Sequence, residues 1–379
     1  MRSRTISILL LAILAVVVVV ALNSAGQTPP PASGSWEIYD DTVYSDTAIT
    51  IDGNVIVYGY GSLTLNNVDL TLGGSGSPEF RVDTSARLVW NGGSLSYSSS
   101  FPGRTYLYSN ATIDGVDFDP HYGIYMSWFN TRVTNCTFGG ATSYGIFLTP
   151  RLNSPVDRPI VIADNTFTGL SRAPISGSIG EHGNGTAGLV IVGNRIDGVT
   201  SSDGINVTVA TANAHVVVSG NQVSNTGGGG ITLTLNVGDL YLRLNNNRVT
   251  DVTDDGVRIT INSMTMDFPG IVDLMVDSAG RVGLDIKATA MPVDGLALIN
   301  HTNLDAGQAA ISLSRTYNVS LIDSHVDTSA TNFVVSQGTL DIRNSYHTRG
   351  SATVTHVDSR ISSWKWVELL CLWQGGIPV

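Results

Sequence analysis

The sequence predicts an all-β protein built as a solenoid, in which one short unit of strands is repeated along the chain. The first observation is a repeated phrase, because "SDGINVTV" (202–209), "GGGITLTL" (228–235) and "DDGVRITI" (254–261) follow one another at intervals of 26 residues. The second is composition: 41 glycines and only 13% charged residues suit a turn-rich β protein. The third is that short alternating runs dominate from Trp36 onward, without a sustained helical period.

The N-terminal segment has the order of an export signal. Arg2 and Arg4 precede an apolar run over residues 6–22. We expect residues 1–25 to be a cleaved signal peptide or a retained membrane anchor, because a run of this length is at the short end of a membrane span. Residues 26–36 are rich in Pro, Ser and Gly and predict a linker. The expected location is extracellular or at the cell surface, with membrane contact only through this segment if it is uncleaved.

A ladder of small residues marks the start of one strand in each unit. Each small residue is followed by alternating apolar positions, and the ladder comprises Gly123, Gly145, Pro174, Gly204, Gly230, Gly256, Gly283 and Ala310. The predicted inward positions of the three clearest copies are Ile205, Val207, Val209, Ile231, Leu233, Leu235, Val257, Ile259 and Ile261. The residues between them, such as Asn206 and Thr232, are predicted to face outward.

A second phrase recurs between these strands: Asn or Ser, any residue, then an apolar one. Its copies are "NTF" (165–167), "NRI" (194–196), "NQV" (221–223), "NRV" (247–249), "SHV" (324–326), "NSY" (344–346) and "SRI" (359–361). We expect the Asn to accept a left-handed backbone at a tight turn and to stack on the Asn of the next coil. Two interleaved ladders with one period indicate one unit wound repeatedly, whose coils bury apolar residues by stacking.

These ladders resemble the repeats of the right-handed parallel β-helix superfamily, also called the pectin-lyase-like fold, and especially its carbohydrate-binding and sugar-hydrolase repeats. "GSLTLNNVDLTL" (61–72) and "ARLVWNGGSLSY" (86–97) resemble the opening coils of cell-surface β-helix proteins. The resemblance implies a single right-handed parallel β-helix solenoid of roughly twelve coils over residues 37–363. It does not fix the activity, because this superfamily includes lyases, hydrolases, epimerases, adhesins and inert spacers.

The C-terminal segment, residues 364–379, departs from the ladder. Its sequence "WKWVELLCLWQGGIPV" alternates apolar residues and then turns at two glycines. We expect either a strand that caps the last coil or the truncated start of a further extracellular domain, since the ending resembles the first strand of an immunoglobulin-like repeat. Cys136 and Cys371 are too far apart in sequence to suggest a disulfide framework, and each is predicted to be a buried free thiol.

The charge of the chain limits its partners. A formal net charge of −11, without a run of Lys or Arg, argues against nucleic acid. The seven His are scattered singly, and the sequence has no haem, nucleotide or zinc signature. No cofactor is predicted, although calcium remains open if the protein is a lyase. The expected partner is a polysaccharide or a cell-envelope glycan.

Three aspartates are the candidate catalytic acids. The resemblance implies that hydrolases of this fold use paired aspartates at strand ends, and Asp203, Asp254 and Asp255 stand just before ladder glycines. Asp203 and Asp255 are two coils apart with Gly229 between them, which corresponds to roughly 9.6 Å. This is near the upper limit of the carboxylate separation in inverting glycosidases. Asp before Gly is also ordinary turn chemistry.

Arg258 is the candidate base of a calcium-dependent lyase, since it is expected to face outward near these aspartates. Asp285 lies one coil further on, so an ion pair between the two is the structural alternative. The hydrolase motifs are incomplete: no Gly-His-Gly segment follows, "DIK" (285–287) lacks their arginine, and "EHGNG" (181–185) comes before the aspartates.

Tyr125 and Phe147 are the first candidate carbohydrate-binding residues. They occupy the outward place next to Ile124 and Ile146 on successive coils. Exposed stacked aromatic rings bind the face of a sugar ring through apolar area. Alternatively, the segment "FDPHYGIYMSWFN" (118–130) folds over them as a loop with its own small core.

Arg195, Gln222 and Arg248 are the second candidate carbohydrate-binding set. They stand at the middle of three successive Asn phrases and are expected to form one outward column. Guanidinium groups match carboxylates, so this column is a candidate for an anionic glycan, with a solvated face as the alternative.

The function predicted from these observations is surface display with glycan or cell-envelope recognition. The alternatives are a polysaccharide lyase or glycoside hydrolase acting through Asp255 and its neighbours, and an inert stalk. Glycosylation sequons occur at Asn110, Asn135, Asn184, Asn206, Asn300 and Asn318, which permits a glycoprotein.

Overall fold

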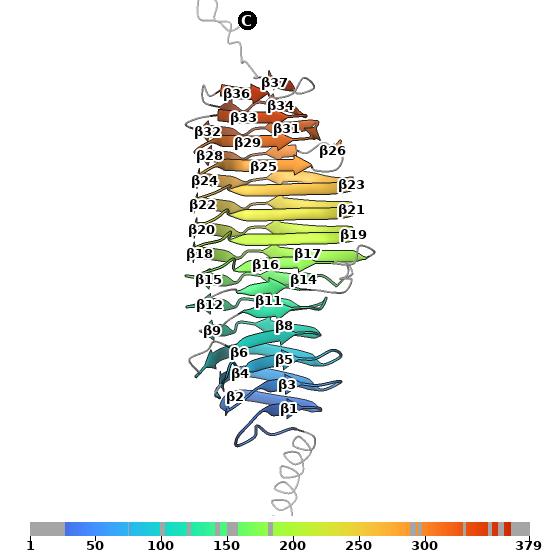
Figure 1. Ribbon diagram of the computed structural model, residues 1–379, viewed down its shortest axis with the longest axis vertical. Helices are drawn as coiled ribbons and strands as arrows, with labels where there is room; N and C mark the ends of the chain where they lie inside the picture. Colours follow the sequence, from blue (N-terminus) through green and yellow to red (C-terminus); the bar gives the residue numbers. More distant parts are fainter. Residues whose placement is uncertain are drawn as a thin grey trace, which may run out of the picture.

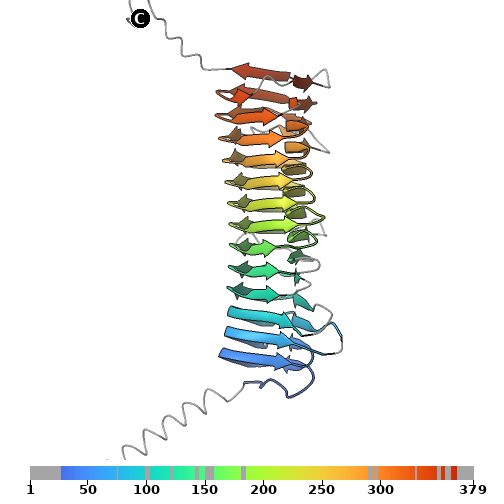
Figure 2. The same cartoon turned by 90° about the vertical axis from the view of Figure 1, so that its left-hand side faces the viewer.

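Parallel strands stack in successive coils along the chain in the computed structural model, from the N-terminal coils at the bottom of Figure 1 to the C-terminal coils at its top. Figure 2 shows the same stack from the side as a row of strands, one above another. The structure describes residues 27–74, 76–98, 103–119, 123–140, 145–149, 158–180, 185–288, 293–294, 298–328, 331–347, 351–354 and 360–364. The predicted signal or anchor, and the predicted C-terminal segment after Trp364, lie outside these residues.

Each coil contributes to three faces, which we call the first, second and third sheets. The first sheet contains β1 (Trp36–Ile38), β3 (Val55–Val57), β5 (Glu79–Val82), β7 (Arg104–Leu107), β10 (Ile124–Met126), β13 (Ile146–Leu148), β16 (Ile175–Ile179), β25 (Val282–Ala288), β29 (Ala309–Ser314), β33 (Thr331–Ser336) and β36 (Ser351–Val354). The second contains β8 (Asn110–Asp114), β11 (Arg132–Thr134), β14 (Ile160–Ala163), β17 (Thr186–Val192), β27 (Leu298–Asn300), β31 (Val319–Ile322), β34 (Thr339–Arg343) and β37 (Arg360–Trp364).

The third sheet contains β9 (Asp117–Asp119), β12 (Thr137–Gly139), β15 (Thr166–Thr168), β18 (Arg195–Val199), β20 (Gln222–Thr226), β22 (Arg248–Val252), β24 (Met275–Ala279), β28 (Asn303–Ala306), β32 (His325–Thr328) and β35 (Tyr346–His347). Long strands join the sheets. The second and third sheets share β2 (Asp41–Ile51), β4 (Ser62–Leu72) and β6 (Arg87–Tyr97), and the first and second share β19 (Ile205–Ser219), β21 (Ile231–Asn245) and β23 (Val257–Val272). A separate parallel pair comprises β26 (Val293–Asp294) and β30 (Thr316–Tyr317).

One column of register partners in the first sheet runs through the whole stack. In order, each residue being paired in parallel with the next, it contains Trp36, Val55, Phe80, Thr105, Ile124, Ile146, Ile175, Ile205, Ile231, Val257, Leu284, Ile311, Phe333 and Ala352. The small-residue ladder precedes this column at every position from Gly123 to Ala310. The prediction of an all-β parallel solenoid is therefore confirmed, and the number of coils differs slightly from the predicted twelve.

The alternation predicted for the small-residue ladder is also confirmed. The nine predicted inward residues between Ile205 and Ile261 are at most 1% exposed, whereas Asn206 is exposed and Thr232 is half-buried. In the third sheet, Phe118, Phe138 and Phe167 stack inside the coils with ring centroids 4.9 and 4.7 Å apart. Each coil thus buries its apolar side chains mainly against the coils above and below it.

Close packing explains the glycines of the ladder. A β carbon on Gly230 would lie 2.3 Å from Cγ1 of Val249 and 2.5 Å from the carbonyl oxygen of Gly256. A β carbon on Gly204 would likewise lie 2.3 Å from Cγ1 of Val223. Contacts this short require the neighbours to move, so the repeated glycine lets the first sheet approach the inward valines of the third.

The asparagines of the second ladder stack in the interior. Asn165, Asn194, Asn221 and Asn247 are at most 1% exposed. The Nδ2 atom of each of the first three donates to Oδ1 of the next, over 3.0, 2.9 and 3.0 Å. The predicted stacking is therefore confirmed for these coils.

The predicted left-handed backbone belongs instead to the residue before each ladder asparagine. Asp164, Gly193, Gly220 and Asn246 have φ between 54° and 66°. Asp, Asn and Gly tolerate this conformation, which carries the chain from the second sheet into the third. The polar side chain one residue later then turns inward and bonds along the stack.

Two copies of the Asn phrase were placed in the wrong register. In "NSY" (344–346) the buried residue is Ser345, because Tyr346 pairs with His325. In "SRI" (359–361) Ile361 pairs with Leu340, so Arg360 and Ile361 belong to β37 of the second sheet. Serine and threonine are frequent on every face of this chain, so the short phrase does not distinguish the turns by itself.

The linker prediction for residues 26–36 stays a prediction, although part of the segment contacts the first coil. Thr28 Oγ1 donates to Asp40 Oδ1 over 2.8 Å, and Trp36 Nε1 donates to the carbonyl oxygen of Thr28 over 3.2 Å. Within the part of the chain that the structure describes, no helix is long and apolar enough to cross a membrane. Cys136 is a buried free cysteine as predicted, and burial raises the pKa of its thiol to about 12.

Candidate functional site

Aromatic side chains line the outer face of the first sheet in its N-terminal half. Tyr106, Tyr125 and Phe147 are register partners on β7, β10 and β13. The ring centroids of Tyr106 and Tyr125 are 5.1 Å apart, and those of Tyr125 and Phe147 are 5.6 Å apart. Tyr108 stacks on Tyr106 at 5.8 Å with an interplanar angle of 4°. We call Tyr106, Tyr108, Tyr125, Phe147 and Trp128 the aromatic face.

The strand pattern fixes these rings on the outside. The inward neighbours Ile124, Met126, Ile146 and Leu148 are all 0% exposed, so the alternate residues of β10 and β13 must point outward. Tyr106, Tyr125 and Phe147 are half-buried, and Tyr108 is 37% exposed.

A cavity of about 440 Å³ opens on this face. Its lining consists of Thr84, Tyr106, Tyr108, Tyr125, Ser127, Trp128 and Thr149. The indole of Trp128 stacks on Phe129 with centroids 4.9 Å apart, which orients one wall. Apolar rings with a few hydroxyl groups between them form the kind of surface that binds a small polar molecule with an apolar face.

The segment predicted to cover these rings as a loop is largely part of the coil itself. Phe118 belongs to β9 and is 0% exposed, and β10 begins at Ile124. Among the residues of 118–130 that the structure describes, Tyr125 and Trp128 line the cavity. The prediction was wrong for these residues because the short strands β9 and β10 do not show the longer alternation of the later coils.

A second cavity, of about 550 Å³, continues the same face toward the C-terminus. Phe147 lines it together with Arg172, Ala173, Ser176, Gly177, Ser178, Ser201, Ser202, Asn206 and Thr208. Ser176 pairs with Phe147 in the register, and Asn206 pairs with Ser176. The outer column of the first sheet therefore passes from aromatic rings to small hydroxyl and amide side chains.

Aromatic contacts also extend toward the N-terminus. Tyr39 and Tyr58 stack with centroids 4.9 Å apart, and the guanidinium of Arg81 lies 5.8 Å from the ring centroid of Tyr58. Arg81 is the register partner of Tyr106. Rings and the planar guanidinium thus follow one another along the axis of the solenoid from the first coil to Phe147.

Asp203 and Asp255 lie in one column on either side of Gly229, as predicted, but each carboxylate binds groups of the chain. Asp203 Oδ1 accepts from the backbone N–H of Gly229 over 2.6 Å, and its Oδ2 accepts from Asn206 Nδ2 over 2.8 Å. The carboxylate of Asp203 therefore reaches over Gly229, the residue between the two aspartates.

Asp255 is buried, with 3% of its side chain exposed, and its Oδ2 contacts Nη2 of Arg258. Its Oδ1 accepts from the backbone N–H of Val282 over 3.2 Å. Burial raises the pKa of Asp255, and the charge of Arg258 opposes this rise. Arg258 also reaches Asp285, over 3.8 Å, so the predicted cross-coil ion pair is present.

Asp254 is more exposed than Asp255 and pairs with Arg281 Nη1 over 2.7 Å and with Arg258 Nη2 over 3.5 Å. Asp254, Asp255 and Arg258 thus form one charged network with Arg281 and Asp285, whereas Asp203 bonds separately to Gly229 and Asn206. The carboxylates of the network hold arginines and backbone amides of neighbouring coils, and whether it has a catalytic role stays a prediction.

Arg195, Gln222 and Arg248 form one column of register partners in the third sheet, as predicted. All three are exposed. They are on a different face from the aromatic rings, so the two predicted binding sets belong to separate surfaces.

The sequence analysis missed Tyr106, Tyr108 and Trp128. The coil of Tyr106 has Arg104 in place of the ladder glycine and precedes the next coil by only 19 residues, from Tyr106 to Tyr125. The alternation of "TYLY" (105–108) was the available signal, because Thr105 and Leu107 are buried beside two outward tyrosines.

No group of three or more His, Cys, Asp or Glu among the described residues is placed to hold a metal ion. The calcium prediction stays untested. Of the predicted sequons, the amides of Asn135 and Asn206 donate to Asp114 and Asp203, and Asn184 lies outside the described residues.

Stacked parallel coils with three sheets and an interior amide ladder define the class: the chain has the right-handed parallel β-helix fold. Residues 122–270 match the family described as "Right handed beta helix region". No curated protein matches the chain by sequence.

Three solved structures are similar to the chain. A mutant of the periplasmic alginate epimerase AlgG has a TM-score of 0.52 at 14% identity, covering 87% of this chain and 77% of that one. The Dettilon tailspike protein has a TM-score of 0.32 at 14% identity, and the match covers 87% of this chain and 61% of the tailspike chain. A tailspike mutant of E. coli bacteriophage HK620 has a TM-score of 0.37 at 12% identity, and the match covers 87% of this chain and 74% of the tailspike chain. At these identities the likeness concerns the fold.

Proposed function

We propose that the protein binds an extended glycan along the outer face of its first sheet. The observation that carries this proposal is the aromatic face, in which three successive coils present rings. Tyr106, Tyr108, Tyr125 and Trp128 line a cavity of about 440 Å³, and Phe147 lines the adjoining one of about 550 Å³. The apolar faces of sugar rings stack on aromatic side chains, and the hydroxyl groups of Ser127 and Thr149 in the lining of the smaller cavity are suited to hydrogen bonding with sugar hydroxyls.

The polar cavity beyond Phe147 supports a ligand longer than one sugar. Its hydroxyl and amide groups, from Ser176 to Thr208, continue the column that the rings begin. Coils repeat about every 4.8 Å along the axis, so a linear chain lying along the rod would meet a new set of side chains at each coil. The alginate epimerase has a fold of this kind, which supports a role with a glycan.

We also propose that the protein is exported and displays this face outside the cell, because a charged and then apolar N-terminal segment precedes a Pro, Ser and Gly-rich stretch. Fractionation of producing cells, with and without residues 1–25, tests the location. Retention of both forms in the cytoplasm would refute export.

The binding test uses the purified chain and a panel of neutral and acidic polysaccharides, with affinity measured by calorimetry. For a polysaccharide that binds, Tyr125→Ala and Phe147→Ala should each weaken binding about tenfold, because each removes apolar stacking area from the face. Tyr60→Ala is the matched control, since Tyr60 is 92% exposed and lies outside the cavity lining. Equal effects of all three variants would contradict the site.

A polysaccharide lyase or glycoside hydrolase is the second candidate, favoured by the buried Asp255 with its raised pKa beside Arg258. The same panel is followed for new reducing ends and for unsaturated uronate absorbance, with and without calcium. Turnover that Asp255→Asn abolishes would establish the enzyme in place of a binding protein. If the protein shows no binding and no turnover with any polysaccharide, the solenoid acts as a structural stalk.

A further inference from the structure

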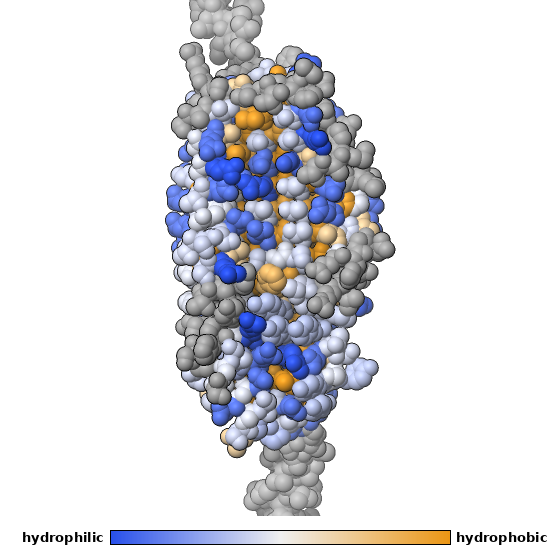
Figure 3. All heavy atoms as spheres, viewed as in Figure 1, coloured by the Kyte–Doolittle hydropathy of each residue, from blue (hydrophilic) through white to orange (hydrophobic). Residues whose placement is uncertain are grey.

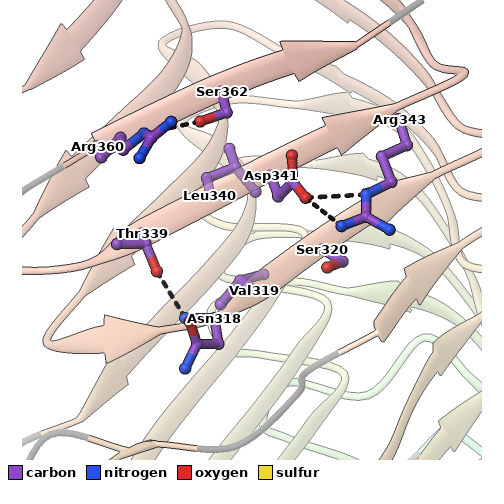
Figure 4. A pocket seen from close by; sticks show the side chains of 9 residues that line it. All are labelled: Asn318, Val319, Ser320, Thr339, Leu340, Asp341, Arg343, Arg360 and Ser362. Carbon is purple, nitrogen blue, oxygen red and sulfur yellow. Dashed lines mark hydrogen bonds and ion pairs between the residues drawn. The ribbon is translucent and has the colours of Figure 1, made fainter.

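A polar pocket lies on the second sheet in the C-terminal coils, away from the aromatic face. It has a volume of about 510 Å³ and is formed by β31, β34 and β37 (Figure 4). Its lining consists of Asn318, Val319, Ser320, Thr339, Leu340, Asp341, Arg343, Arg360 and Ser362. We call this the second-sheet pocket.

The register of three strands builds the pocket as a regular array. Ser320, Asp341 and Ser362 are successive partners in one outward column, and Thr339 pairs with Arg360 in the column beside it. Val319 and Leu340 alternate with these residues and are each 1% exposed. Small side chains at Ser320 and Ser362 leave room on either side of the carboxylate of Asp341.

Charged groups are already oriented in this pocket. Oδ2 of Asp341 accepts from Nε and Nη2 of Arg343 over 2.8 and 2.6 Å. Nε of Arg360 donates to Ser362 Oγ over 3.0 Å, as Figure 4 shows. Arg360 is exposed, and its terminal guanidinium nitrogens have no hydrogen bond or ion pair to the described residues.

One buried acceptor in the pocket lacks a partner. Oδ1 of Asp341 is buried and receives no hydrogen bond from the described residues. A buried carboxylate oxygen without a donor is unfavourable, because it has lost its hydrogen bonds to water without gaining others. A ligand that turns the carboxylate toward the pocket and donates a hydroxyl to Oδ1 would supply the missing bond.

We propose that the second-sheet pocket binds an acidic saccharide, by which we mean a sugar residue that carries a carboxylate. The guanidinium of Arg360 pairs with the ligand carboxylate, since a planar guanidinium matches that group with two parallel hydrogen bonds. Once its carboxylate turns toward the ligand, Oδ1 of Asp341 accepts a sugar hydroxyl, and the hydroxyl groups of Ser320 and Thr339 bond to others. This site does not depend on the aromatic face, which lies on another sheet.

The test measures binding of a tetrasaccharide of galacturonic acid and of its methyl ester, which keeps the sugar rings but removes the charge. The full chain carries Tyr125→Ala and Phe147→Ala, so that the aromatic face does not contribute. We expect the acid to bind at least about tenfold more tightly than the ester. Arg360→Gln should weaken binding of the acid about tenfold, and Arg360→Lys should restore part of it.

Arg132→Gln is the matched control, because Arg132 is also an exposed residue of the second sheet but lies outside the pocket. The chain with Arg132→Gln should bind the acid as tightly as the chain that carries only Tyr125→Ala and Phe147→Ala. Equal binding of acid and ester, or a loss in the control as large as that in Arg360→Gln, would overturn the proposal. Competition by sodium sulfate as strong as by the tetrasaccharide would also overturn it, because the pocket would then select only an anion.

Discussion

At the residue scale, the ladder asparagines satisfy buried groups that the turns leave open. Oδ1 of Asn221 accepts from both the backbone N–H and Nδ2 of Asn194, over 3.1 and 2.9 Å. Its own Nδ2 donates to the carbonyl oxygen of Ile191 and to Oδ1 of Asn247. One buried amide therefore holds three coils in register, and no shorter side chain can replace all of these bonds.

Asn221→Ala should lower the free energy of unfolding by about 3 kcal/mol, because it leaves several buried donors and acceptors without partners. The measurement is the midpoint of denaturant unfolding followed by circular dichroism. Asn206→Ala is the control, since Asn206 is exposed and its amide, among the residues that the structure describes, donates to Asp203 alone. Similar losses in the two variants would show that stacking of the amides is not what stabilises the turn.

At the scale of single elements, carboxylates fasten the turn of one coil to the next. Oδ1 of Asp197, on β18, accepts from Ser224 Oγ over 2.8 Å and from Asn225 Nδ2 over 2.6 Å. Asn225 has φ of 54°, so its side chain is fixed where the backbone is left-handed. The bonds from Asn225 and Ser224 lower the pKa of Asp197 below its ordinary 3.8.

This shift predicts an acid-dependent link between β18 and β20. Because the folded-state pKa of Asp197 is depressed, its contribution to stability is present above the unfolded-state pKa and is lost as the pH falls through the lower folded-state value. Asp197→Asn should therefore destabilise the protein near neutral pH, and the difference from the parent should shrink toward about pH 3. Thermal unfolding of the parent and of Asp197→Asn at several pH values measures this difference in stability. If the difference does not change with pH, the charge of Asp197 does not have this role.

The elements that the sequence predicted best were those with long, strict alternation. Residues such as Ile205 and Ile231 were placed correctly because β19 and β21 begin with several alternating positions after a glycine. The aromatic face was found only in part: Tyr125 and Phe147 follow ladder glycines, whereas Tyr106 does not. Cavities depend on several coils at once, so the pairing of Ser320, Asp341 and Ser362 could not be read from spacing before their register was known.

The candidate catalytic aspartates show the same limit. Sequence spacing correctly placed Asp203 and Asp255 in one column around Gly229, because that depends only on the repeat. It could not show that the carboxylate of Asp203 turns back onto the amide of Gly229, because that depends on side-chain rotamers and hydrogen bonds.

At the scale of the whole molecule, the protein is a stack of coils that contact mainly their neighbours. Hydrophilic residues predominate on the face shown in Figure 3, with apolar residues visible between them. The apolar core is continuous along the stack, but each coil packs against the coils next to it, so stability is close to a sum over coils and the contacts between them. A ligand site that spans a few coils, such as the aromatic face, should therefore tolerate changes elsewhere in the stack.

This architecture predicts that one complete coil can be removed. Ile205 and Ile231 are register partners, so deletion of residues 205–230 joins Gly204 to Ile231 and restores a ladder glycine before an inward isoleucine. The same deletion places Asn194 next to Asn247, which keeps the buried amide ladder continuous, and it brings Arg195 beside Arg248. The shortened chain should fold with the same circular dichroism spectrum and should keep glycan binding at the aromatic face, with Thr232 and Thr234 taking the places of Asn206 and Thr208 in the second cavity.

Deletion of residues 205–217 is the control, because it removes about half a coil. It joins Gly204 to Val218, an inward residue of the second sheet, and takes out the first-sheet strand of that coil. The coils on either side would then meet in the wrong phase, since a solenoid buries its apolar columns only when whole units stack. This variant should lose cooperative unfolding; if both deletions behave alike, the coil is not the unit from which the stability of this protein is built.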